Sequence, residues 1–237
     1  MVNEKENMKV MISGDSSGLG YELCKTLHKD YDVVGFSRKK RVVMDMLGHW
    51  RHFEFDLNNY KDVPDLICDE LSSADILIHN AAISSNNLVV VEPNSVYEQL
   101  MKINVLAPVH LTKLWIKGRL LQQKYGHVLF VSSICTKKHF KGLSAYSMTK
   151  SAINSFSKTI ATEMSSKGIR SNSILPGYMK TNMTEELSDE QLNKIKNRTP
   201  MKRLVDVEEV CDTIHFVISA GTFLNGSEII IDGGFTI

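Results

Sequence analysis

The sequence predicts an α/β fold in which helices cover both faces of one doubly wound, seven-stranded parallel sheet. Short apolar runs rich in Val and Ile alternate with longer helical patterns along all 237 residues. These runs are apolar on both faces, as in strands of a parallel sheet that is covered by helices. No Pro-, Gly- or Ser-rich linker, repeat or low-complexity tract divides the chain, so we expect a single domain over residues 1–237.

The elements follow one another as strand, helix, strand. The predicted strands are Met8–Ser13, Asp32–Phe36, Arg51–Phe55, Asp75–His79, His127–Ser132, Ile169–Leu175 and Ser227–Ile231. The predicted helices are Leu19–Lys29, Tyr60–Ser72, Ser95–Tyr125, Ala145–Lys167, Ser188–Asn197 and Val207–Ser219. This alternation predicts right-handed crossovers and a ligand site beyond the carboxyl ends of the strands, where the strand order reverses.

Composition excludes several classes of protein. Hydrophobic residues make up 43% and charged residues 23% of the chain, which is near the globular average. A formal net charge of +1 offers no general attraction for nucleic acid or anionic membranes. The four cysteines are scattered without metal-binding spacing, so we expect free thiols, a reducing compartment and no metal. The polar start and the lack of a long apolar run predict a cytoplasmic protein without a signal peptide or membrane helix.

A glycine-rich turn, Gly14–Gly20, links the first strand to the first helix. Glycines let the backbone approach a pyrophosphate, and the helix N-terminus presents free N–H groups to it. The turn could be purely structural, but its place after the first strand of an alternating chain favours dinucleotide binding. Asp15, an acid next to Gly14 within this turn, is expected to cap the helix or to point away. The predicted cofactor-binding residues here are Gly14, Ser16, Ser17, Gly18, Leu19 and Gly20.

The end of the second strand indicates which dinucleotide is bound. NAD sites usually place an acid at this position to hold the ribose 2′-hydroxyl. This chain has Ser37 and Arg38 there, followed by Lys39, Lys40 and Arg41, and no acid. Because an arginine can hold a 2′-phosphate with two charge-assisted hydrogen bonds, Ser37 and Arg38 predict NADP(H) over NAD(H). The alternative is a solvated basic loop.

Tyr146 and Lys150 lie four residues apart in a predicted helix, with Ser133 upstream. Side chains at this spacing share one helical face. An ammonium group near a phenol favours the phenolate, so it is expected to lower the tyrosine pKa from about 10 towards neutrality. Such a phenol can pass a proton to or from a substrate oxygen. An isolated pair of this kind occurs by chance in many helices, so the rest of the chain decides its meaning.

With these motifs in view, the chain resembles the single-domain short-chain dehydrogenase/reductases over nearly its whole length. Its pattern is closest to that of the 3-oxoacyl-carrier-protein reductases. The family shares the Rossmann fold expected here. The matching segments are Ser13–Gly20, Asp56, His79–Ala82, Lys102–Val105, Val131–Ser133, Tyr146–Lys150, Pro176–Thr181, Pro200–Leu204 and Asn225–Gly234.

The resemblance implies a set of functional residues. The implied catalytic residues are Asn104, Ser133, Tyr146 and Lys150. The further implied cofactor contacts are Asp56, Leu57, Asn80, Ala81, Ala82, Tyr146, Lys150, Pro176, Gly177, Met179 and Thr181. In this family the tyrosine is the general acid or base, the lysine also holds the nicotinamide ribose, and the asparagine holds a water of the proton relay. The resemblance therefore implies hydride transfer between a nicotinamide and a ketone or secondary alcohol, in a homodimer or homotetramer.

Two residues depart from the family pattern. His79 and Ala82 stand where the family usually has Asn and Gly. Ala82 adds a methyl group close to the cofactor, and His79 is expected to be packed and hydrogen-bonded rather than catalytic. His49 and His52 flank Trp50 without a third ligand nearby, which favours loop packing over a metal site.

The sequence leaves the substrate open. Lys137, Lys138 and Lys141, between Ser133 and Tyr146, suggest an anionic substrate, although a solvated basic loop fits them equally well. Residues 184–203 are polar and could form a substrate lid. The alternatives to a simple ketoreductase are an enzyme acting on sugar nucleotides or other anionic substrates, and a dinucleotide-sensing binding protein without turnover.

Overall fold

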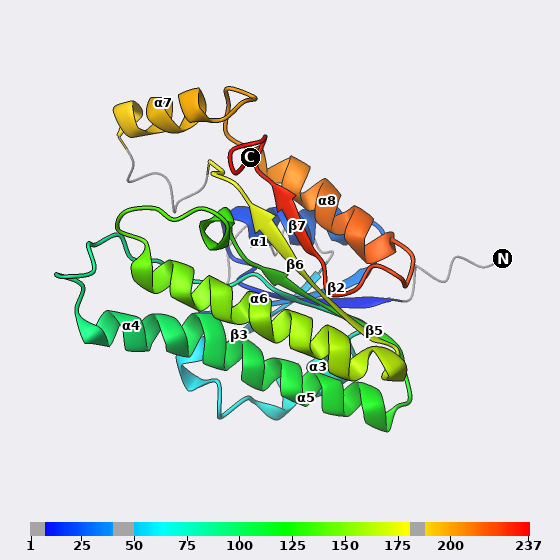
Figure 1. Ribbon diagram of the computed structural model, residues 1–237. Helices are drawn as coiled ribbons and strands as arrows, with labels where there is room; N and C mark the ends of the chain where they lie inside the picture. The colour runs from blue at the N-terminus through cyan, green and yellow to red at the C-terminus, as the bar shows by residue number, and fades with distance from the viewer. Residues whose placement is uncertain (1–7, 40–49, 181–187) are drawn as a thin grey trace.

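The protein folds around one parallel sheet with the strand order β3-β2-β1-β4-β5-β6-β7, as a computed structural model shows (Figure 1). The structure describes residues 8–39, 50–180 and 188–237. The strands are β1 Lys9–Ser13, β2 Asp32–Ser37, β3 Trp50–Glu54, β4 Ile76–His79, β5 Gly126–Val131, β6 Ile169–Pro176 and β7 Glu228–Ile231. Each lies within one residue of its predicted bounds. The predicted doubly wound, seven-stranded sheet is therefore confirmed.

Helices cover both faces of this sheet. They are α1 Gly18–Leu27, α3 Asp65–Ser73, α4 Asn94–Met101, α5 Ala107–Leu121, α6 Ser144–Met164, α7 Asp189–Arg198 and α8 Val207–Ser219. Side chains alternate along β1: Val10 and Ile12 pack towards α1 and α8, whereas Met11 packs towards α3, α5 and α6. This two-sided burial explains the apolar runs of the central strands β1, β4 and β5.

Proline positions account for two of the differences between the predicted and the observed helices. The helix expected from Tyr60 begins at Asp65, directly after Pro64, because the residue before a proline is disfavoured in helical conformation. The single helix expected over 95–125 is divided by a π-helical segment, η3 Lys102–Leu106. Pro108 has no N–H to donate to the Asn104 carbonyl one turn earlier, so the helix widens around Asn104.

Candidate functional site

Two glycines set the backbone of the turn between β1 and α1. Gly14 has a φ of +77°, which favours glycine. A Cβ on Gly20 would overlap the Gly14 carbonyl and lie 2.5 Å from Nδ2 of Asn80. Ser17 is the N-cap of α1 but makes no side-chain cap hydrogen bond, which leaves the first N–H groups of the helix for a ligand. A dinucleotide therefore fits the residues of this turn.

Asn80 and Ala81, at the end of β4, hold the turn in place. Nδ2 of Asn80 donates to the Ser13 carbonyl at 3.2 Å and to the Gly14 carbonyl at 3.1 Å. The backbone N–H groups of Asn80 and Ala81 both donate to Oγ of Ser13 at 3.1 Å. Ala82 follows at the same edge of the sheet and is partly buried. Ser13 was missing from the predicted site residues, although its place directly before Gly14 was the available signal.

The predicted adenosine end lies along the carboxyl ends of β2 and β3. Ser37 is half-buried at the end of β2, and Arg38 is exposed beyond it. Oδ1 of Asp56 accepts hydrogen bonds from the backbone and side chain of Asn58, which caps the short helix η2 Leu57–Asn59. Leu57 is buried. Lys40 and Arg41 lie outside the described residues.

The predicted nicotinamide end follows β6. The Gly177 N–H donates to the Ile231 carbonyl at 2.8 Å, and a Cβ on Gly177 would lie 2.9 Å from Cα of Asp232. A larger residue at position 177, directly after β6, would therefore clash with the backbone that follows β7. Met179 pairs with Val205 in an isolated bridge. Thr181 lies outside the described residues.

The structure brings together Ser133, Tyr146 and Lys150. Ser133 follows β5 and caps the short helix η4 Ile134–Thr136, while Tyr146 and Lys150 lie on α6. Ser133 hydrogen-bonds the Tyr146 side chain. Nζ of Lys150 donates to the Val131 carbonyl at 2.7 Å and lies 5.5 Å from the centre of the Tyr146 ring. Two α6 residues one turn apart thus meet the end of β5, as the spacing predicts.

Burial dominates the ionisation of this site. It raises the pKa of Tyr146; the nearby Cys135 thiol adds to the rise and the hydrogen bond with Ser133 opposes it. Burial also lowers the pKa of Lys150 to about 8. The sequence predicted a tyrosine pKa lowered by Lys150, but here the ammonium group lies over the ring and points to the Val131 carbonyl. The phenol is therefore held in its protonated form.

Asn104 connects three elements of the site. Its Oδ1 accepts from the Ile83 N–H at 2.9 Å, and its Nδ2 donates to the Ile83 carbonyl at 2.8 Å and to Oγ1 of Thr149 at 3.1 Å. Thr149 in turn donates to the Tyr146 carbonyl at 2.8 Å. Asn104 thus joins the loop after β4 to the helix that carries Tyr146. The water relay expected for Asn104 stays a prediction. Sequence reasoning missed Thr149, although its place between Tyr146 and Lys150 was a signal.

His79 is a packed side chain, as expected. Its Nε2 lies 2.8 Å from Oγ1 of Thr112, and its ring stacks on Phe130 with the centres 5.1 Å apart. Burial, helped by the charge of Lys150, lowers the pKa of His79 to about 3. The imidazole is therefore neutral at physiological pH.

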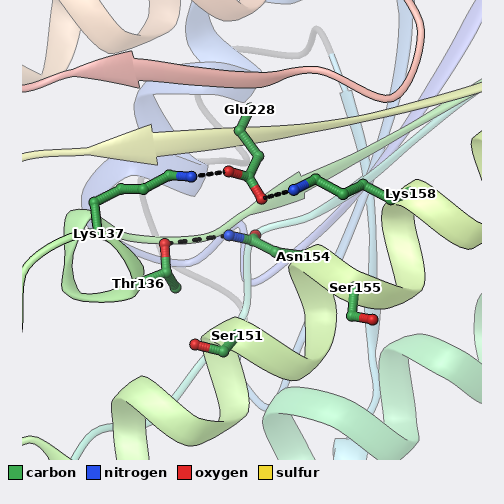
Figure 2. Close-up of a pocket in the computed structure, with 7 residues that line it drawn as sticks. All are labelled: Thr136, Lys137, Ser151, Asn154, Ser155, Lys158 and Glu228. Atoms are coloured by element: carbon green, nitrogen blue, oxygen red, sulfur yellow. Dashed lines mark hydrogen bonds and ion pairs between the residues drawn. The ribbon is translucent and has the colours of Figure 1, made fainter.

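Two of the three lysines after Ser133 are paired with protein groups. Lys137 forms an ion pair with Glu228, which also pairs with Lys158 at 2.7 Å (Figure 2). Nζ of Lys138 donates to the Phe235 carbonyl at 2.9 Å and lies 4.9 Å from the centre of that ring. Lys141 is exposed. The pairing of Lys137 and Lys138 favours a structural reading of the basic loop over a substrate-binding one.

A polar pocket of about 240 Å³ lies beside these ion pairs (Figure 2). Its lining residues are Thr136, Lys137, Ser151, Asn154, Ser155, Lys158 and Glu228. Lys137 is the only one of them that the sequence analysis connects with a substrate, and none is a predicted catalytic or cofactor-binding residue. The pocket is therefore distinct from the group formed by Ser133, Tyr146 and Lys150.

Helix α7 occupies half of the predicted lid, residues 184–203. It begins with a capping box between Ser188 and Gln191, and it contains no buried residue. In Figure 1 it lies apart from the sheet, near the C-terminus. Residues 184–187 lie outside the described residues, so the lid stays a prediction.

The sequence model of the family described as "Enoyl-(Acyl carrier protein) reductase" matches residues 15–236. The chain belongs to the short-chain dehydrogenase/reductase family. It is 31% identical to a 3-oxoacyl-(acyl-carrier-protein) reductase FabG of Buchnera aphidicola subsp. Schizaphis graminum, with 97% of each chain covered. It is 28% identical to carbonyl reductase family member 4 of Xenopus laevis, over 95% of this chain and 97% of that one.

A solved structure also supports the assignment of the chain to this fold. A 4-hydroxyisoleucine dehydrogenase complexed with NADH superimposes with a TM-score of 0.90 at 26% identity, over 97% of this chain and 99% of that one. The protein is thus an oxidoreductase acting on CH–OH and C=O groups. No helix within the described ranges is long and apolar enough to span a membrane.

Proposed function

We propose that this short-chain dehydrogenase/reductase is an NADPH-dependent ketoreductase that converts a ketone to a secondary alcohol. The observation that carries the proposal is the meeting of Ser133, Tyr146 and Lys150 at the carboxyl edge of a sheet whose first turn suits a pyrophosphate. In this fold, ligands bind beyond that edge. A dinucleotide on the turn and a carbonyl at Tyr146 would therefore share one cleft.

The chemistry divides between the dinucleotide and the chain. When bound, the dinucleotide supplies the hydride that the carbonyl carbon receives. Tyr146 then gives its proton to the carbonyl oxygen, so the C=O group becomes CH–OH. The Ser133 hydroxyl donates a hydrogen bond to the same oxygen as negative charge develops on it. The raised pKa of Tyr146 supports this direction, because a protonated phenol is the form that reduction needs.

The preference for NADPH is supported by the end of β2. Ser37 and Arg38 are partly or fully exposed there, where they could meet a 2′-phosphate. No acid occupies the first two positions after β2, where NAD sites usually place one. The related dehydrogenase solved with NADH shows that relatives of this fold use the other dinucleotide. The preference must therefore be measured directly.

A 3-oxoacyl thioester is the proposed substrate. The curated relative from Buchnera is named for this chemistry. The rings of Phe140, Tyr178 and Phe235 pack against one another with their centres 5.7–5.8 Å apart, and Phe140 lies in the segment between Ser133 and Tyr146. They offer an apolar surface for an acyl chain. Because Lys137 and Lys138 are paired within the protein, a sugar nucleotide is the less favoured substrate. The Ser133–Tyr146 pair suits a carbonyl oxygen, and so it favours ketone over enoyl reduction.

We further propose a cytoplasmic homo-oligomer. All four cysteines are free and three are buried, which suits a reducing compartment. Strand β7 is at one edge of the sheet, and Phe216 on the neighbouring α8 and Ile230 on β7 are exposed. An open apolar edge of this kind suits pairing with a second copy.

A substrate panel tests the proposal. NADPH oxidation is followed by absorbance with a 3-oxoacyl thioester, the matching 2-enoyl thioester and a keto-sugar nucleotide. We expect turnover with the first compound only. Turnover with the enoyl thioester alone would replace the proposal with C=C reduction. Tight NADPH binding without turnover of any compound would favour a dinucleotide sensor.

A further inference from the structure

A buried acid–histidine pair links the phosphate-binding turn to β3. Asp15 belongs to the turn, but its carboxylate points across β2, with Oδ2 lying 2.6 Å from Nδ1 of His52. The two side chains are 0% and 1% exposed. Gly35 makes this reach possible, because a Cβ at that position would overlap the Asp15 carboxylate. Gly35 on β2 lies directly opposite His52 on β3. The Asp15 side chain therefore passes over β2 at Gly35 to reach His52.

His52 is the only described side chain that forms a hydrogen bond with the Asp15 carboxylate. Oδ1 of Asp15 and Nε2 of His52 are both buried and have no hydrogen-bond partner within the described part of the chain. An unpaired buried carboxylate is strongly disfavoured, whereas a paired one is tolerated. An imidazolium at His52 would balance the charge of the Asp15 carboxylate, and no other described side chain forms an ion pair with Asp15.

The pair lies close to the proposed 2′-phosphate site. Ser37 comes two residues after Gly35 along β2, and at the rise of a parallel strand this is about 7 Å. Arg38 follows directly. NADPH carries a phosphate on this ribose and NADH does not. Both dinucleotides carry the pyrophosphate, so an uncompensated negative charge on Asp15 would weaken the binding of both, and it would weaken NADPH more because of the additional 2′-phosphate.

We propose that His52 determines dinucleotide specificity by neutralising Asp15. His52 acts through Asp15 and touches no cofactor atom, so it is a positioning residue. The inference rests on the proposed function, because it needs a dinucleotide on the turn. The inference explains how an acid, Asp15, can stand in a phosphate-binding turn. The explanation depends on His52, which is 37 positions away in the sequence.

The test compares the Kd values of NADPH and NADH, measured by fluorescence, in wild type and matched variants. His52→Asn keeps an N–H donor towards Asp15 but cannot carry charge. We expect its ratio of NADPH Kd to NADH Kd to rise roughly ten- to hundredfold, the effect of a nearby screened charge on a phosphate. Adding Asp15→Asn to His52→Asn removes the charge and should restore the wild-type ratio. Arg38→Ala, which removes the proposed phosphate ligand, is the positive control for a change in the ratio.

The ratio of the two Kd values distinguishes a role of His52 in dinucleotide specificity from a role in supporting the fold. Equal weakening of both dinucleotides in His52→Asn would show that the pair only shapes the turn and would overturn the inference, as would an unchanged ratio. If thermal denaturation shows that His52→Asn is unfolded, the Asp15→Asn variant tests the inference by itself. The preference of Asp15→Asn for NADPH over NADH should equal or exceed that of wild type. A lower preference for NADPH would overturn the inference. Failure of the wild type to bind either dinucleotide would instead refute the proposed function.

Discussion

Tyr146 and Lys150 lie one helical turn apart on α6, and burial shifts their pKa values in opposite directions. A phenol kept protonated and an ammonium made easier to deprotonate suit proton transfer towards a substrate oxygen. Perturbed pKa values of this kind gather at functional sites, although buried structural groups also show them. The proposed function therefore rests on the contact with Ser133 as well as on these shifts.

The pKa of Lys150 predicts an alkaline limit to activity. Because burial lowers this pKa to about 8, the ammonium form is present below that pH and is lost above it. If the charge is needed, kcat/KM for ketone reduction should be level at lower pH and fall about tenfold per pH unit above about 8. A pH–rate profile measures this. Lys150→Arg, which stays charged, should move the fall to higher pH. A wild-type profile that stays level to pH values well above 8 would contradict the prediction.

At the scale of elements, the local sequence is enough to predict the strands and the motifs. The contacts between strands depend on residues that are distant in the sequence. Every strand was predicted to within one residue, and the pattern is simplest in the central strands β1, β4 and β5, which are buried on both faces. Pro64 and Pro108 are visible in the sequence, but periodicity alone did not show that they shift one helix and widen another. The contact between Asp15 and His52 needs the register of β2 and β3. Sequence spacing could not supply that register.

The turn after β1 gives a prediction for one element. Gly20→Ala should weaken dinucleotide binding at least about tenfold, because its Cβ would overlap the Gly14 carbonyl and displace the turn from Asn80. The change would otherwise favour helix α1, since alanine has the higher helix propensity. Titration of NADPH fluorescence measures the effect. Gly221→Ala is the matched control, as a Cβ there meets nothing within 4 Å. Equal affinity in the two variants would contradict the role of the turn.

At the scale of the whole molecule, the order of the strands places the site and leaves one edge open. The order reverses between β1 and β4, and the turn, Asn80 and Ser133 all follow strands at or beside that point. This is where a doubly wound sheet binds ligands. At the far edge, β7 has a strand neighbour on one side only. The sequence predicted an oligomer through family resemblance, but only the fold shows which apolar residues are exposed.

The open edge predicts how assembly can be disrupted. Ile230→Lys combined with Phe216→Asp places charges at two exposed apolar positions, one on β7 and one on α8, so the particle mass in solution should fall by at least one step of assembly. Light scattering coupled to size-exclusion chromatography measures the mass. Leu66→Lys is the matched control, because Leu66 is 68% exposed on α3, away from β7. A mass unaffected by the double change would contradict assembly through this edge.

The central claim is that the Tyr146 hydroxyl delivers the proton that completes ketone reduction. The most direct measurement is a single-turnover assay of NADPH oxidation with a 3-oxoacyl thioester, comparing wild type with Tyr146→Phe. Losing one general acid should slow the chemical step about a hundred- to ten-thousandfold, while NADPH affinity changes little. A Tyr146→Phe enzyme that binds NADPH normally and reduces the ketone at the wild-type rate would contradict the account.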